Sequence, residues 1–212
     1  MDAFGALKTM GSTRRSLLTG IGVGLVALAA RPLVTRAADR GPPPLAPPPL
    51  AGEFREYFIV QDPPLPAPLT HFGGPDGAEL NLGAFLGKVV LVNIWATWGP
   101  PCVVEMPALD RLQGALGAEG VAVVTVSQDR AGLGAVVPFF AGRQLRHLQP
   151  YSDAKGYLAD ALGVRGLPTS FLIDPKGFVV GLLEGPAEWD SPDAKALLRH
   201  YLPAGAKTGT AT

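Results

Sequence analysis

The sequence predicts an α/β fold built on a parallel strand–helix–strand unit. Two apolar runs, residues 88–95 and 121–127, are each continuous enough to be a strand buried on both faces. A helical segment that begins near Pro101 separates the two runs, and a crossover of this kind joins parallel strands. The apolar stripe of this helix consists of Met106, Leu109, Leu112 and Leu116.

Glycines mark the ends of the predicted helices. Gly117 and Gly120 end the first helix, because glycine readily adopts the left-handed backbone found at helix termini. Two shorter helices are expected over 136–142 and 154–162, and Gly163 closes the second of them. The alternation of these helices with apolar runs is typical of an α/β protein.

A hairpin and a last helix complete the predicted domain. Strands are expected over 170–174 and 177–183, joined by a tight Pro-Lys-Gly turn. The last helix has Ser191 as its N-cap, Pro192 at its first position and Asp193 at its positive end. A mixed sheet of parallel and antiparallel strands follows from this order.

Composition limits the classes of function. The 212 residues carry 18 basic and 18 acidic side chains, so the formal net charge is zero and nothing in the bulk charge attracts nucleic acid. An apolar content of 47% is enough for a substantial core. The chain has 1 cysteine, Cys102, so no disulfide within one chain is possible.

Residues 1–38 resemble a bacterial twin-arginine export signal. Arg14 and Arg15 precede an uncharged apolar stretch over residues 16–30. Fifteen helical residues span about 22 Å, short of the roughly 30 Å hydrocarbon core of a bilayer. The resemblance implies export of a folded protein to the periplasm. Retention of an uncleaved signal as a tether to the inner membrane is the alternative.

A proline-rich linker is expected over 39–66, followed by the domain over 67–202 and a flexible tail over 203–212. Of the 22 prolines, ten lie between Pro42 and Pro68. Such a density favours an extended spacer over helix or sheet. Within the linker, residues 53–61 carry aromatic side chains that could lie against the domain.

Several separated motifs resemble one known family over residues 67–202. Residues 96–102 read Ala-Thr-Trp-Gly-Pro-Pro-Cys, directly after a predicted strand and at the start of a helix. The further matching strings are 87–98, 105–107, 126–130, 166–174 and 185–192. Together they resemble the TlpA/ResA family of thiol–disulfide oxidoreductases. The resemblance implies a thioredoxin-like fold, with helices on both faces of a central mixed sheet, and no cofactor.

The redox motif departs from the family pattern Trp-Cys-x-x-Cys. In the family, the first cysteine attacks a substrate disulfide and the second resolves the mixed disulfide. Here Gly99 stands at the first position and Cys102 at the second. One chain therefore cannot run a two-cysteine cycle. Because one base change converts a cysteine codon to a glycine codon, a non-native Gly99 is a further explanation that resequencing tests.

Three roles remain open for Cys102. It is a slow single-thiol exchanger, a former of mixed disulfides with a small thiol, or an unreactive core residue. Its place in the first turn of a helix favours the thiolate, whereas burial disfavours it.

The resemblance also assigns roles to residues around the motif. Glu105 matches an acidic residue that moves protons near the thiols; the alternative is an ordinary solvated glutamate. Pro168 matches a cis-proline that faces the motif and leaves the backbone of the preceding residue free to pair with a peptide. The predicted substrate groove consists of Trp98, Pro100, Leu167, Pro168 and Thr169.

Other classes of site do not fit. A peroxiredoxin needs its reactive cysteine near position 99, and a copper chaperone needs more thiolates than one. The three histidines, His71, His147 and His200, are scattered, and no zinc or serine-hydrolase pattern is present. No metal is expected.

Two functions remain. One is residual thiol exchange through Cys102, with a redox partner or glutathione supplying the second sulfur. The other is a non-catalytic module that holds an exported client polypeptide or an assembly partner in the groove.

Overall fold

A computed structural model describes residues 46–203. The predicted export signal, the first part of the predicted linker and all but the first residue of the predicted tail lie outside this range.

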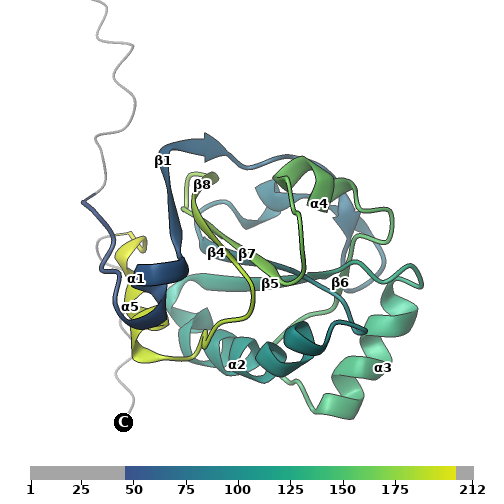
Figure 1. The fold of residues 1–212 in the computed structure, drawn as a ribbon. Coiled ribbons are helices and arrows are strands. Elements are labelled where there is room, and N and C mark those ends of the chain that lie inside the picture. Colours follow the sequence, from purple (N-terminus) through teal and green to yellow (C-terminus); the bar gives the residue numbers. More distant parts are fainter. Residues whose placement is uncertain (1–45, 204–212) are drawn as a thin grey trace, which may run out of the picture. The chain divides into compact units, whose positions relative to one another are not determined.

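The centre of the fold is a mixed sheet with the strand order β1-β8-β7-β4-β5-β6-β2-β3 (Figure 1). Its strands are β1 (Ile59–Pro66), β2 (Phe72–Gly73), β3 (Glu79–Leu80), β4 (Val89–Trp95), β5 (Val121–Ser127), β6 (Tyr151–Ser152), β7 (Thr169–Ile173) and β8 (Phe178–Glu184). Strand β4 pairs with β5 in parallel and with β7 antiparallel, and β7 pairs antiparallel with β8. The parallel unit and the hairpin are therefore confirmed, and the fold is thioredoxin-like.

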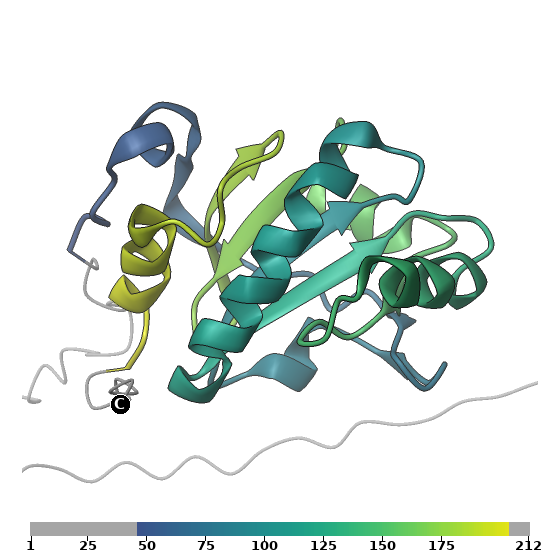
Figure 2. The same ribbon diagram turned by 90° about the horizontal axis from the view of Figure 1, so that it is seen from below.

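Helices cover both faces of the sheet. They are α1 (Gly52–Tyr57), α2 (Pro100–Leu116), α3 (Leu133–Arg143), α4 (Tyr157–Leu162) and α5 (Pro192–His200), with short 3₁₀ turns at η1 (Leu82–Phe85) and η2 (Gly117–Glu119). Figure 2 shows α2 crossing the sheet between α5 and α3. Buried residues of α1, α2, α3 and α5 share one core cluster, whereas those of α4 and η1 belong to a second.

The alternation of side chains along a strand separates these two clusters. In β4, Leu91 and Trp95 belong to the cluster under α2, and Val92 and Ile94 belong to the cluster under α4. Every residue of β4 is buried, as the largely apolar run over residues 88–95 predicted. Asn93 falls between Leu91 and Trp95 in this alternation, so its polar side chain is directed toward α2.

Two helices differ from their predicted bounds. Helix α3 begins at Leu133 rather than near residue 136. Helix α4 begins at Tyr157 rather than near residue 154, because Asp153 Oδ2 accepts hydrogen bonds from the N–H groups of Leu158 and Ala159 (2.9 and 3.0 Å) and so caps the helix from outside it. The predicted ends at Gly117 and Gly163 are confirmed.

The predicted domain boundary near Ala67 also differs from the structure. Residues 52–66, assigned to the linker, form α1 and β1, and β1 pairs with β8 in the main sheet. Strand β1 accepts its prolines because it lies at the edge of the sheet and carries a bulge between Val60 and Leu65. Phe54 of α1 is buried against Trp189, with ring centroids 5.2 Å apart.

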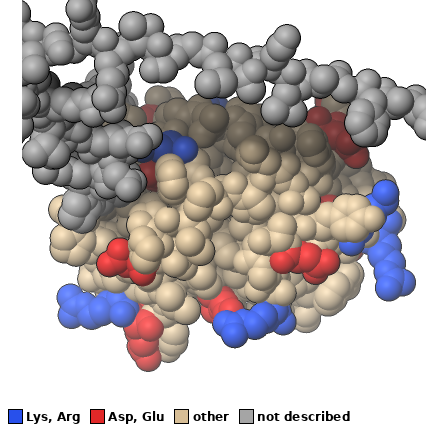
Figure 3. Space-filling view, turned by 90° about the horizontal axis from the view of Figure 1, so that it is seen from above, with Lys and Arg blue, Asp and Glu red and all other residues tan. Residues whose placement is uncertain are grey.

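Charged side chains are few on the face that Figure 3 shows. Acidic and basic residues are scattered there on a mostly uncharged background, and some of opposite sign lie side by side. Among residues 46–203, no helix combines the length and the apolar character needed to cross a bilayer.

Candidate functional site

The candidate site lies where β4 ends and α2 begins. Trp95 is the last residue of β4, and Pro100 opens α2, so Cys102 is the third residue of the helix. Proline suits the first helical turn, since its missing N–H would have no partner inside the helix. The first backbone hydrogen bond of the helix runs from the Val103 N–H to the Gly99 carbonyl (3.0 Å). The motif thus has the position that the sequence predicted.

Cys102 is buried. Its exposed fraction is 0%, and its neighbours in the core include Met106 and Trp95. Burial raises the pKa of the Cys102 thiol above its usual value, and the nearby carboxylates of Glu105 and Asp129 add smaller effects in the same direction. The thiol is therefore shielded and neutral, which slows both attack on a disulfide and metal binding.

Gly99 lies directly against the sulfur. It is itself buried, and a Cβ atom built on it would lie 2.9 Å from Cys102 Sγ. In a disulfide, the Cβ of one cysteine lies about 3 Å from the Sγ of the other, as follows from the S–S bond length and ordinary bond angles. The backbone at this junction thus has the spacing of a cysteine pair, although residue 99 carries no thiol.

Glu105 is the second titratable group of the site, and it is only 3% exposed. Its Oε1 accepts a hydrogen bond from Asn93 Nδ2 (2.8 Å), and its Oε2 accepts one from the Ala187 N–H (3.2 Å). Burial raises the pKa of Glu105 to about 7, although these hydrogen bonds oppose the rise. The solvated-glutamate alternative is therefore wrong, and the side chain can hold or release a proton near neutral pH.

The hydrogen-bond partners of Glu105 come from strand β4 and from the loop after β8, and strand β7 contacts one of them. Asn93 Nδ2 also donates to Ser170 Oγ of β7 (2.9 Å), and Asn93 pairs with Ser170 in the sheet. The Asn93 Oδ1 atom is buried without a partner within the described residues. The Trp189 indole also lowers the pKa of Glu105, although within the described residues Trp189 Nε1 has no hydrogen-bond partner.

The Leu167–Pro168 peptide bond is cis, as the resemblance implied. Thr169 pairs with Ile94, so Pro168 lies beside the end of β4 and the start of the motif loop, residues 96–99. Leu167 packs against the core cluster that contains Cys102. Within residues 46–203, neither the N–H nor the carbonyl of Leu167 has a hydrogen-bond partner.

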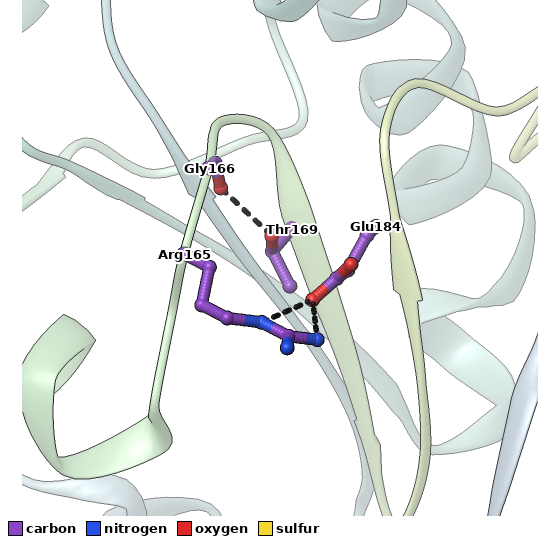
Figure 4. Close-up of polar contacts among 4 residues, drawn as sticks. All are labelled: Arg165, Gly166, Thr169 and Glu184. Carbon is purple, nitrogen blue, oxygen red and sulfur yellow. Dashed lines mark hydrogen bonds and ion pairs between the residues drawn. The ribbon is translucent and has the colours of Figure 1, made fainter.

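The loop before Pro168 is tied to its own hairpin. Thr169 Oγ1 donates to the Gly166 carbonyl (2.8 Å), and Arg165 Nη2 donates to Glu184 Oε1 of β8 (2.8 Å), as Figure 4 shows. The Gly185 N–H donates to the Pro168 carbonyl (2.8 Å). These contacts fix the loop while leaving the Leu167 backbone unpaired.

The predicted groove residues differ in exposure. Trp98 is 69% exposed and Pro100 is exposed, whereas Leu167 is half-buried. Pro168 and Thr169 are buried, so they do not line the surface of the predicted groove. Trp95 lies in the core, with an exposed fraction of 0%.

Sequence reasoning missed two features beside the motif. Val104, one turn into α2, is 78% exposed and borders a depression of about 450 Å³ that also contacts Glu105, Pro186 and Glu188. Asp129 is 6% exposed and binds the motif loop through Thr97. Residues 126–130 matched the family string, but nothing in one sequence shows that this carboxylate returns to the loop.

Among residues 46–203, no three His, Cys, Asp or Glu side chains are arranged to hold a metal ion.

Known proteins are similar to this chain over the described domain. The Redoxin family model matches residues 64–198. The thiol-disulfide oxidoreductase ResA of Halalkalibacterium halodurans is 33% identical over 135 residues, which cover 64% of this chain and 69% of that protein. The thiol:disulfide interchange protein DsbE of Pseudomonas aeruginosa is 38% identical over 95 residues, 44% of this chain and 49% of that one. For the ResA of Bacillus thuringiensis, 35% identical, the match spans 62% of its length and 52% of this chain.

Solved structures resemble the same domain. A thiol:disulfide interchange protein of the thioredoxin family from Chlorobium tepidum is 30% identical with a TM-score of 0.54, covering 64% of this chain and 97% of that one. The pneumococcal exposed lipoprotein thioredoxin from Streptococcus pneumoniae is 27% identical with a TM-score of 0.51, covering 61% of this chain and 98% of that one.

Proposed function

The chain belongs to the Redoxin family, as a thioredoxin-fold relative of the ResA and DsbE thiol–disulfide oxidoreductases, and we propose that it is an exported member that binds polypeptide clients without catalysing dithiol exchange. One observation carries the proposal. The position of the attacking cysteine is Gly99, and the remaining sulfur, on Cys102, has no exposed surface.

Burial argues against single-thiol exchange as the main activity. The sulfur must approach a substrate disulfide as a thiolate, yet the Cys102 thiol is buried and its pKa is raised. A mixed disulfide formed on Cys102 would also find no second thiol in the chain to resolve it.

The residues to which the resemblance assigns peptide contact are present. Trp98, on the loop after β4, is 69% exposed, and within residues 46–203 the backbone N–H and carbonyl of Leu167 have no hydrogen-bond partner. An extended peptide can hydrogen-bond to such backbone groups as an added strand, with neighbouring apolar side chains supplying further contact. A client polypeptide or an assembly partner is therefore the proposed ligand, and no nucleic acid or metal is needed.

The proposed location is the periplasm. Support comes from the twin-arginine pattern over residues 1–38 and from the description of the similar pneumococcal protein as exposed. Fractionation of cells that make the full chain tests the location. Recovery from the periplasm as a shortened protein supports cleavage of the signal, recovery with the membrane supports the tether, and recovery from the cytoplasm contradicts export.

The client proposal is tested with reduced, carboxymethylated α-lactalbumin, a permanently unfolded polypeptide that lacks free thiols. We expect Trp98→Ala to weaken its binding about tenfold, in the range of an exposed aromatic anchor. Tyr57→Ala is the matched control, since Tyr57 is 55% exposed but lies on α1. Equal losses in both variants, or none in Trp98→Ala, would contradict the proposed groove.

The absence of dithiol catalysis is tested by insulin reduction. We expect the natural protein and its Cys102→Ser variant to give the same rate as a blank. Turnover by the natural protein that disappears in Cys102→Ser would instead establish single-thiol exchange.

A further inference from the structure

The carboxylate of Asp129 binds the motif loop from outside it. Asp129 follows β5, and its Oδ2 accepts from the Thr97 N–H (2.9 Å) and from Ser127 Oγ (2.6 Å). Its Oδ1 accepts from Thr97 Oγ1 (2.7 Å). Hydrogen bonds to a carboxylate are among the stronger polar contacts in a protein.

Both hydrogen-bond donors of Thr97, its backbone N–H and its hydroxyl, bind to the Asp129 carboxylate. The adjacent Gln128 N–H donates to the Trp95 carbonyl (2.8 Å), which extends the connection between the end of β5 and the loop. Inside the loop, the Gly99 N–H donates to the Ala96 carbonyl (3.2 Å). Among the described residues, Asp129 is therefore the only side chain that hydrogen-bonds to Thr97.

The loop fixed in this way has two faces. Trp98 points outward with 69% of its surface exposed, whereas Gly99 lies over the Cys102 sulfur. A shift of Thr97 would consequently move the aromatic contact surface and uncover the thiol together.

We propose that Asp129 is a positioning residue, which holds the loop 96–99 closed over Cys102 and fixes Trp98 for client binding. This inference deepens the proposed function and, for the client, rests on it. The effect on Cys102 needs no client and can be measured by itself.

The reactivity of the Cys102 thiol measures how often the loop opens, because the sequence has 1 cysteine and no other thiol reacts. The experiment measures the reaction of the full chain with Ellman's reagent at constant pH, in the natural protein and in Asp129→Ala. We expect the reaction to be about tenfold faster in the variant, as for the loss of a carboxylate hydrogen-bond acceptor. Because removal of the Asp129 carboxylate also lowers the pKa of the Cys102 thiol, Thr97→Val, which keeps the carboxylate, separates loop opening from this charge effect.

Asp110→Ala is the matched control. Asp110 is 8% exposed against 6% for Asp129. Like the Asp129 carboxylate, the Asp110 carboxylate accepts three hydrogen bonds, all at Oδ1, from the N–H groups of Arg146, His147 and Leu148. Both variants are expected to lose stability, but the control loses contacts to a different loop. We expect its thiol to react faster only in proportion to its global unfolding.

Urea separates local from global opening. If the loop opens locally, low urea concentrations leave the rate for Asp129→Ala nearly unchanged, because little surface is exposed. A rate that rises with urea as steeply as the unfolding equilibrium would mean that Asp129 acts only on stability, and the inference would be overturned.

Thr97→Val keeps the test decisive if Asp129→Ala does not fold. Valine has the shape of threonine but cannot donate to Asp129 Oδ1, so the thiol should react several-fold faster in a folded protein. A thiol as protected as in the natural protein would overturn the inference.

Carboxymethylated α-lactalbumin then connects the loop to the client. We expect Thr97→Val to weaken its binding about threefold, as a smaller version of the Trp98→Ala effect. A faster thiol reaction with unchanged binding would refute the client half of the inference and leave the loop half standing. Binding that is insensitive to Trp98→Ala as well would refute the proposed function itself.

Discussion

At the scale of single residues, the contact between Gly99 and Cys102 governs the chemistry of the site. The missing side chain at residue 99 leaves room for a sulfur that has no exposed surface. The same contact limits what residue 99 can be, since any Cβ there lies 2.9 Å from Cys102 Sγ. A bond between two sulfurs is the one arrangement in which that distance is ordinary.

Gly99→Cys should therefore form a disulfide with Cys102 with little movement of the backbone. We expect mild oxidation to remove both free thiols, as measured by thiol titration and by the mass loss of a hydrogen pair, and the variant to gain insulin reduction. Gly99→Cys with Cys102→Ser is the control and should remain inactive. If the single variant folds but never forms the intramolecular disulfide, the placement of the motif is wrong.

Glu105 makes stability depend on pH. Its pKa is about 7 in the folded protein, against 4.5 as the ordinary value, so the folded state keeps a proton that the unfolded chain has lost across that interval. The free energy of unfolding should consequently be highest below the lower value and fall as the pH rises through the upper one. The loss from this group is on the order of 3 kcal/mol.

Urea denaturation at about pH 5 and about pH 8 measures this dependence. We expect the fall in the free energy of unfolding to be smaller in Glu105→Gln, which cannot ionise. Parallel profiles for the two proteins would show that Glu105 is not protonated near neutral pH in the folded state.

At the scale of elements, α1 and β1 join the domain although their sequence resembles a linker. Strand β1 carries prolines, yet its backbone pairs with β8 at two separate points on either side of a bulge. Helix α1 is six residues long, too short to be stable alone, and it packs through Phe54 against Trp189. Packing, rather than helix propensity, accounts for this element.

Phe54→Ala should therefore destabilise the whole domain, by about 3 kcal/mol for a fully buried phenylalanine. Tyr57→Ala, on the same helix but 55% exposed, should change the free energy of unfolding by no more than about 0.5 kcal/mol. Chemical denaturation of the two variants makes the comparison. Equal free energies of unfolding for Phe54→Ala and the natural protein would show that residues 52–57 are a spacer and do not stabilise the domain.

At the scale of the whole molecule, the site is assembled from segments far apart in the chain. Glu105 of α2 contacts Asn93 of β4 and the Ala187 loop that follows β8, and Asn93 contacts Ser170 of β7. The sheet brings these residues together because Asn93 and Ser170 are paired across β4 and β7 and share the face under α2. This framework is present although residue 99 is a glycine.

Much of the fold was predictable because its signals are local. The buried runs of β4 and β5, the Pro-Lys-Gly turn and the Ser191 cap each express a preference of a few neighbouring residues, and the structure confirms them. The late start of α4 was not predictable in this way, because the capping group is the side chain of Asp153, several residues before the helix. The return of Asp129 to Thr97 spans 32 residues and has no local signal at all.

The sequence by itself determined that no chain of this protein can complete a dithiol cycle, because that conclusion requires only a count of cysteines. It also determined the alternation of strands and helices, through the periodicity of apolar residues. Only the tertiary structure decided that the Cys102 sulfur is shielded, that the pKa of Glu105 is raised to about 7 and that residues 52–66 belong to the domain. Burial is the physical reason in each case, since the solvent exposure of a side chain depends on what distant segments pack against it.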